Sequence, residues 1–221
     1  MSSRKNVWSK KRRKSLNIPI GKTVLFIYCG KCTEPLYFKA ALNDIKESMD
    51  KAAKGITSFS FYDKVCDIDP LRITTKIPNI VDSFNKRFDE VYVVFDKDDY
   101  PDDNFDMAIN KINKMSTNDC QYFPLWSNQC IELWFLLHFE YLQANINRKD
   151  YINKLNIYLP QKYKKNMEGL YLILKRDKNS INHAIERAQK LLSSHESVLC
   201  SKKNPATNVF VFFEKYKEYL N

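Results

Sequence analysis

The stretch TVLFIYCGKCTEP, residues 23–35, decides the fold that the chain is expected to adopt. Its first six residues form an apolar run of strand length, which is typical of a strand buried on both faces of a sheet. A short loop follows at residues 29–32, and Thr33 is a suitable N-cap for a helix with Glu34 and Pro35 in its first turn. The stretch therefore predicts a buried strand, a tight loop and a helix in succession.

The same alternation continues along the chain to about residue 142. Apolar or alternating runs predict further strands at residues 58–62, 91–95 and 121–126. Helical spacing of apolar residues predicts helices at residues 33–53, 77–88, 104–115 and 131–139. Strands that alternate with helices indicate βαβ units, so we expect an α/β fold with a mostly parallel four-stranded sheet flanked by helices.

The rest of the chain shows helical patterns only. They cover residues 149–158, 164–175, 178–194 and 206–219. We therefore expect three parts: a disordered basic arm (1–22), an α/β domain (23–145) and a helical C-terminal extension packed on that domain (146–221).

Composition sets the class of protein. Hydrophobic residues make up 44% of the 221 residues and aromatic residues 14%, which is enough for a packed core and excludes a disordered chain. No run approaches the ~18 apolar residues of a membrane span, and the N-terminus lacks a signal-peptide pattern. We expect a cytoplasmic protein without membrane contact, in which the six cysteines are reduced thiols.

The net charge of +10 is unevenly distributed. Residues 1–22 carry eight basic residues and no acid, residues 23–147 have a net charge of −6, and residues 148–221 have a net charge of +8. An acidic centre between basic ends suits an enzyme that holds a cation and acts on a polyanion, with Arg12 and Arg13 of the arm as nucleic-acid contacts. A solvated basic tail is the simpler alternative.

Two aspartates follow the strand predicted at 91–95. Asp96 and Asp98 come directly after it, and ligands of parallel sheets bind at the carboxyl ends of strands. If the first and third strands are neighbours, the loop with Glu34 faces this pair. Oxygen ligands favour Mg²⁺ or Mn²⁺, whereas a helix cap or an acidic turn is the structural alternative.

Four blocks of the chain, in order, resemble the RloB-like proteins. They are TVLFIYCGKCTEPLYF (23–38), VYVVFDKDD (91–99), SNQCIELWFLLHF (127–139) and NPATNV (204–209). The resemblance implies a TOPRIM fold and a divalent-metal-dependent nuclease that acts on RNA, such as tRNA, or on DNA. It also implies a role in bacterial anti-phage defence by abortive infection, with an ABC-type ATPase encoded nearby as partner. We further expect that the chain can form a homo-oligomer.

The resemblance also assigns residues. It implies that Asp96 and Asp98 bind Mg²⁺ or Mn²⁺, and that a glutamate after the first strand acts as general acid or base. Cys29 stands at that glutamate's position, so Glu34 or Glu132 is expected to supply the missing carboxylate. In the alternative, the substitution has disabled the chemistry and the chain is a nucleic-acid-binding or regulatory partner of the ATPase.

Other polar residues of these blocks are candidates as well. Lys31 and Lys97 flank the predicted site and Asn128 precedes a helix, so we expect these three residues to contact the nucleic acid. The Cys29 and Cys32 pair has the spacing of a redox or zinc motif, but two inert thiols explain it equally simply. His138 lies in an apolar helix, where a histidine is more often part of the core.

Overall fold

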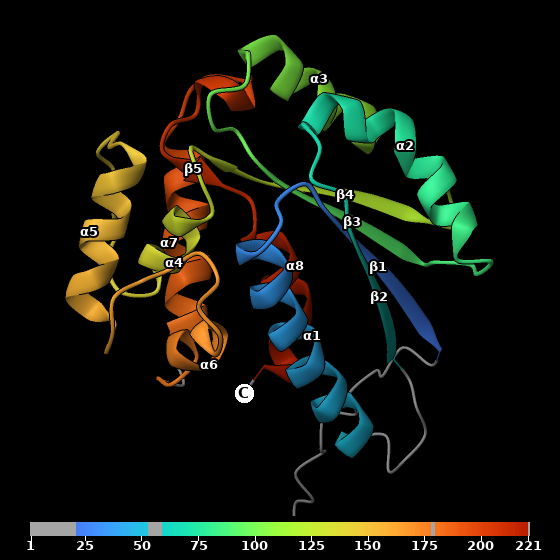
Figure 1. Ribbon diagram of the computed structural model, residues 1–221, viewed down its shortest axis with the longest axis horizontal. Coiled ribbons are helices and arrows are strands. Elements are labelled where there is room, and N and C mark those ends of the chain that lie inside the picture. The colour runs from blue at the N-terminus through green and yellow to red at the C-terminus, as the bar shows by residue number, and fades with distance from the viewer. Residues whose placement is uncertain (1–20, 53–58, 178–179, 221) are drawn as a thin grey trace, which may run out of the picture.

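The computed structural model of the protein describes residues 21–52, 59–177 and 180–220 (Figure 1). Residues 1–20 of the expected basic arm, with Arg12 and Arg13, lie outside the described residues, whereas Lys22 begins β1. Five strands form one sheet in this part of the chain, in the order β2-β1-β3-β4-β5. They are β1 (Lys22–Tyr28), β2 (Phe59–Val65), β3 (Glu90–Asp96), β4 (Gln121–Asn128) and β5 (Ala206–Thr207).

The α/β prediction and the adjacency of the first and third strands are confirmed. β1 runs parallel to both β2 and β3, with Tyr28 opposite Val94, and β3 runs parallel to β4. The predicted count of four strands is wrong, because β5 adds an antiparallel fifth strand next to the end of β4. A strand of two residues is too short to leave a periodic pattern in the sequence.

Helices cover both faces of the sheet (Figure 1). One face packs against α2 (Pro70–Ser83) and α3 (Asp102–Asn113). The other face packs against α1 (Thr33–Ala52), α4 (Glu132–Leu137) and the C-terminal helices. These are α5 (Arg148–Tyr158), α6 (Leu170–Leu174), α7 (Ser180–Ser193) and α8 (Phe210–Tyr216), with 3₁₀ turns η1 (Cys200–Lys202) and η2 (Lys217–Tyr219).

Aromatic side chains dominate the core between α1, α8 and the sheet. The Phe26 ring on β1 stacks on Tyr92 of β3 at a centroid distance of 4.9 Å. Phe212 of α8 meets Phe26 edge-on at 5.1 Å and Tyr92 at 5.3 Å. Each fully buried aromatic contributes about 3 kcal/mol or more relative to alanine, so these contacts fix α8 on the sheet.

Three predicted helices differ clearly in their extent, and the one expected at 164–175 is only α6, Leu170–Leu174. The helix expected at 77–88 runs from Pro70 to Ser83, because Asp69 caps it by accepting a hydrogen bond from the Arg72 amide at 2.8 Å. The helix expected at 206–219 begins only at Phe210, since the backbone before it pairs with β4. Within the described residues, no helix is both long enough and apolar enough to cross a membrane.

Candidate functional site

A cleft of about 410 Å³ lies where the loops after β1 and β3 meet. The two loops converge because the strands are parallel neighbours, and the Cys29 amide donates a hydrogen bond to the Val94 carbonyl at 3.0 Å. All four carboxylates expected in the site line this cleft: Glu34, Asp96, Asp98 and Glu132. The structure thus brings together residues that lie about a hundred positions apart in the chain.

Glu34 reaches the cleft from the first turn of α1. Glu34 is 7% exposed, and its carboxylate turns back over Gly30 rather than toward solvent. Its own backbone amide donates to the carboxylate. A glycine at position 30 leaves the space that this folded-back side chain needs.

Glu132 enters from the first turn of α4 and is almost fully buried, with 1% of the residue exposed. The Tyr163 hydroxyl donates a hydrogen bond to its Oε1 at 3.0 Å. Its Oε2 is buried and has no hydrogen-bond partner among the described residues. A buried carboxylate oxygen left without a donor is costly, and a bound cation would compensate it.

Asp96 ends β3, and Asp98 follows in a backbone conformation with φ of +43°. Burial raises the pKa of Asp96 well above its usual value, and the charges of Glu34, Glu132 and Asp98 raise it further. Burial also raises the pKa values of Glu34 and Asp98. The carboxylates therefore destabilise one another's charged forms, which is the electrostatic condition that a cation relieves.

Arg148 supplies a positive charge inside the cleft. It is the first residue of α5, and its guanidinium pairs with Asp98 and lies 3.6 Å from Asp96. Lys165 also lines the cleft and favours the ionised forms of Glu34 and Asp98. Arg148, Lys165 and Tyr163 were not among the predicted site residues, because they come from segments outside the strand-end loops on which the prediction rested.

The cysteine at the expected glutamate position is largely buried. Burial raises the pKa of the Cys29 thiol well above its usual value, and the neighbouring Cys66, Glu34, Asp69 and Asp96 add to the shift. Cys66 follows Val65, which pairs with Tyr28, and its charge raises the pKa of the Cys29 thiol, whereas Cys32 is exposed. All six cysteines are free thiols. Cys29 and Cys32 therefore differ in burial and form no disulfide, although they have the C-x-x-C spacing.

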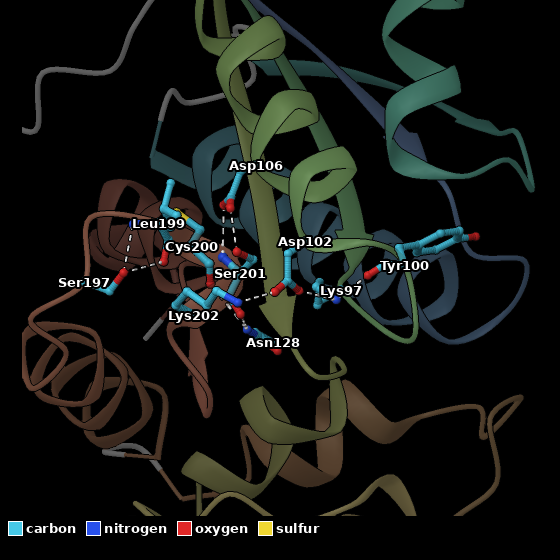
Figure 2. Close-up of polar contacts among 10 residues, drawn as sticks. All are labelled: Lys97, Tyr100, Asp102, Asp106, Asn128, Ser197, Leu199, Cys200, Ser201 and Lys202. Carbon is cyan, nitrogen blue, oxygen red and sulfur yellow. Dashed lines mark hydrogen bonds and ion pairs between the residues drawn. The ribbon is translucent and has the colours of Figure 1, made fainter.

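The predicted nucleic-acid contacts lie in different places. Lys31 lines the cleft and pairs with Asp67 at 2.6 Å, with 68% of its side chain exposed. Figure 2 shows Lys97 and Asn128 in a polar network with Asp102 and residues 197–202. Neither residue is among those that line the cleft.

In that network, Lys97 donates to the Tyr100 carbonyl and pairs with Asp102 at 3.1 Å. Asn128 donates to the Ser201 carbonyl at 2.8 Å. Both side chains are therefore engaged in joining the ends of β3 and β4 to their neighbours.

His138 lies outside this cleft and is buried. Its Nδ1 is 2.8 Å from the Ser180 hydroxyl, and its ring meets the Trp134 ring edge-on at 5.2 Å. Burial lowers the pKa of His138 to about 3, so the imidazole is neutral near pH 7. These contacts agree with a core histidine that holds α4 against α7.

The carboxylates of the cleft are suitable ligands for a hard divalent cation. Asp96 and Asp98 with Glu34 offer oxygen donors, and Glu132 has an unpaired buried oxygen. No three His, Cys, Asp or Glu side chains are arranged as a ready-made metal site in the part of the chain that the structure describes. The guanidinium of Arg148 lies where the two aspartates would share a cation.

The family model described as RloB-like protein matches residues 25–215. The matched region begins in β1, ends in α8 and includes every residue of the carboxylate cleft. No curated protein and no solved structure matches the chain.

Proposed function

The chain belongs to the RloB-like family, and on that premise we propose that it is a divalent-metal-dependent nuclease with a TOPRIM-type site. The observation that carries the proposal is the convergence of Glu34, Asp96, Asp98 and Glu132 in one cleft at the carboxyl ends of β1 and β3. Hydrolysis of a phosphodiester needs carboxylates for a cation, a base for water and positive charge around the phosphate. The cleft offers all three.

The residues take distinct roles in this proposal. Asp96 and Asp98 hold Mg²⁺ or Mn²⁺, together with Glu34. When bound, the cation supplies positive charge that stabilises the charge developing on the phosphate. If Glu34 is not itself bound to the cation, it would instead accept a proton from the attacking water. Glu132, held by Tyr163, completes the acidic wall of the cleft.

The substrate is a nucleic acid, RNA (such as tRNA) or DNA. Lys31, Lys165 and Arg148 line the cleft and carry the positive charge that a phosphate backbone requires. The basic arm at residues 1–20 adds seven cations to the chain. A cytoplasmic role in abortive infection against phage, with an ABC-type ATPase as partner, is proposed from the family alone.

A second candidate is a catalytically degenerate regulatory module. Cys29 favours it, because a buried thiol with a raised pKa replaces the carboxylate expected directly after β1. In this case the cleft would contribute binding to nucleic acid or to the ATPase rather than cleavage. A neutral thiol is a weak ligand for Mg²⁺, so the outcome depends on whether Glu34 fills that role.

The test uses the full chain with end-labelled RNA and DNA in Mg²⁺, Mn²⁺ or EDTA. We expect cleavage with either metal, none with EDTA, and a loss of at least ~100-fold in Glu34→Gln. Glu47→Gln, an exposed glutamate on the same helix, is the matched control. A wild-type protein that cleaves no substrate in any metal, but still binds nucleic acid, would support the regulatory candidate.

A further inference from the structure

We infer that Arg148 is the resident counter-cation of the carboxylate cleft and that a divalent ion binds only by displacing its guanidinium. This inference deepens the proposed function, on which it rests, because it concerns how the same cleft admits its metal. It starts from the contacts that Arg148 makes in the protein, and it predicts a change in metal affinity that can be measured without any nuclease assay.

The guanidinium bridges the two aspartates that the proposed site needs. Its Nη2 pairs with Asp98 Oδ1 and lies 3.6 Å from Asp96 Oδ2. The side chain of Asp96 is 10% exposed, so its charge is shielded from water and depends on partners inside the protein. A cation shared by the two carboxylates would occupy the region where the guanidinium now lies.

The position of Arg148 in its helix shows that the carboxylates hold it there. Arg148 is the first residue of α5, after Asn147, whose Oδ1 accepts a hydrogen bond from the Asp150 amide at 3.2 Å. The macrodipole disfavours a cation at a helix N-terminus by roughly 0.3–1 kcal/mol. The contacts of the guanidinium with Asp96 and Asp98 compensate this cost.

The hydrogen bonding of Arg148 is incomplete, so release of the guanidinium breaks few contacts. Its Nε is buried and has no hydrogen-bond partner among the residues that the structure describes. In the same cleft, Glu132 Oε2 is likewise buried and has no hydrogen-bond partner among the described residues. Arginine thus neutralises part of the charge of the cleft but leaves one carboxylate oxygen unsatisfied, which a smaller divalent ion could reach.

Binding of a divalent ion and retention of Arg148 oppose each other. Two cations beside Asp96 and Asp98 would repel one another in a partly buried site, where charges interact more strongly than in water. The ion must therefore overcome the existing ion pair, and removing the guanidinium should raise metal affinity. A gain of about tenfold corresponds to ~1.4 kcal/mol at 25 °C.

The test is calorimetric titration of Mn²⁺ into the full chain, comparing wild type with Arg148→Gln, Arg148→Lys and Lys149→Gln. Lys149 is the next residue on α5, is exposed, and provides a control for the loss of one positive charge. We expect Arg148→Gln to bind Mn²⁺ about tenfold more tightly than wild type and Lys149→Gln to match wild type. Arg148→Lys should lie between them, since lysine keeps the positive charge but lacks the planar guanidinium.

The same experiment separates the failure of this inference from the failure of the proposed function. Mn²⁺ affinity that is unchanged or weaker in Arg148→Gln, while wild type binds, overturns the inference and leaves the metal-dependent nuclease standing. Absence of Mn²⁺ binding in all folded variants overturns both. Circular dichroism checks that each variant is folded. If Arg148→Gln does not fold, the Mn²⁺ affinity of Arg148→Lys is compared with that of wild type. Arg148→Lys keeps the charge, and the inference predicts that it binds Mn²⁺ more tightly than wild type does.

Discussion

The carboxylate of Glu34 lies directly over Gly30, with its Cδ 2.7 Å from the position that a β-carbon on residue 30 would take. A glycine and a glutamate four residues apart are thus matched, and the missing side chain of one makes room for the other. This match turns Glu34 toward the ends of β1 and β3. It therefore offers a way to move the carboxylate without changing it.

We expect Gly30→Ala to displace the Glu34 carboxylate with little loss of stability. The added methyl meets only the end of a flexible side chain, and the backbone of Gly30 is not among the described residues with positive φ. Metal-dependent cleavage should fall about as far as in Glu34→Gln, while the urea unfolding midpoint stays close to wild type. A further drop when Gly30→Ala is added to Glu34→Gln would show that the methyl acts by another route.

Replacing either aspartate of the pair should remove metal binding without unfolding the protein. Asp96→Asn or Asp98→Asn deletes a proposed ligand, and in the metal-free protein it also relieves repulsion among buried carboxylates. We expect no measurable Mn²⁺ binding by calorimetry and an undiminished melting temperature. Asp99→Asn, at the exposed neighbouring position, is the control and should bind Mn²⁺ as wild type does.

The strands that carry this site, and the strand ends at which it lies, could be predicted from the sequence. Two continuous apolar runs identified β1 and β3 as buried parallel strands, and the rule that ligands bind at strand carboxyl ends placed Asp96 and Asp98 opposite the loop of Glu34. Glu132 was found only through its place in a family block. Only three residues separate the end of β4 from α4, so Glu132 in the first turn of that helix lies close to the strand end.

Other features depended on contacts that no local pattern encodes. Arg148 is fifty positions from Asp98, and Tyr163 is thirty-one from Glu132, so the sequence could not show that these pairs meet. The surroundings of Lys97 depend on such contacts too, because its amine donates to the Tyr100 carbonyl and pairs with Asp102.

Deletion of residues 1–20 should weaken nucleic-acid binding without affecting the fold. The deletion removes seven cations, and the remaining chain begins at the residue before β1. Each lost phosphate contact should reduce the slope of log affinity against log salt by ~0.9 for duplex DNA and ~0.7 for single strands. Binding measured by fluorescence anisotropy at several salt concentrations gives the slope.

Arg12→Gln with Arg13→Gln is the smaller version of that change. If both residues contact phosphates, the slope should fall by about 1.8 for duplex DNA and about 1.4 for single strands. A slope that equals the wild-type value in the deletion would mean that the arm takes no part in binding.

A second charged cluster, at the opposite ends of the strands, should make the fold sensitive to acid. Glu90 is buried, and both Lys22 and Lys215 pair with its Oε1. Its Oε2 accepts hydrogen bonds from the hydroxyls of Tyr92 at 2.8 Å and Tyr216 at 2.7 Å. Burial raises the pKa of Glu90, but the bonds from Lys215, Lys22 and the two tyrosines outweigh it and hold the pKa below its usual value.

A carboxylate with a lowered pKa in the folded state stabilises the protein above its unfolded pKa of about 4.3, and the stability is lost as the pH falls through the folded value. We expect Glu90→Gln to cost ~1–3 kcal/mol at pH 7, because it removes the buried charge that accepts hydrogen bonds from two partly exposed lysines and two tyrosines. Its stability should also vary less than that of wild type between pH 5 and pH 3. Urea unfolding across this range measures both effects, and the exposed Glu47→Gln should follow wild type throughout.

Cys29→Glu tests whether the position after β1 still belongs to the site. A glutamate there would place another carboxylate in the cleft with Asp96, whose charge already raises the pKa of the Cys29 thiol. If Glu34 already serves as the base, Cys29→Glu should add little to cleavage, or should reduce it by crowding carboxylates in a buried site, whereas Glu34→Gln abolishes cleavage. If Glu34 is instead a structural acid of α1, Glu34→Gln should have little effect and Cys29→Glu should raise cleavage or create it. Because Glu34 turns over Gly30 into the cleft, we expect the first result.

The measurement is the initial rate of cleavage in Mn²⁺ for wild type, both single variants and the double variant. Cys32→Glu, in the same loop but at an exposed residue, shows whether any added carboxylate has the same effect. Full activity in Glu34→Gln together with a gain in Cys29→Glu would contradict the role that we assign to Glu34.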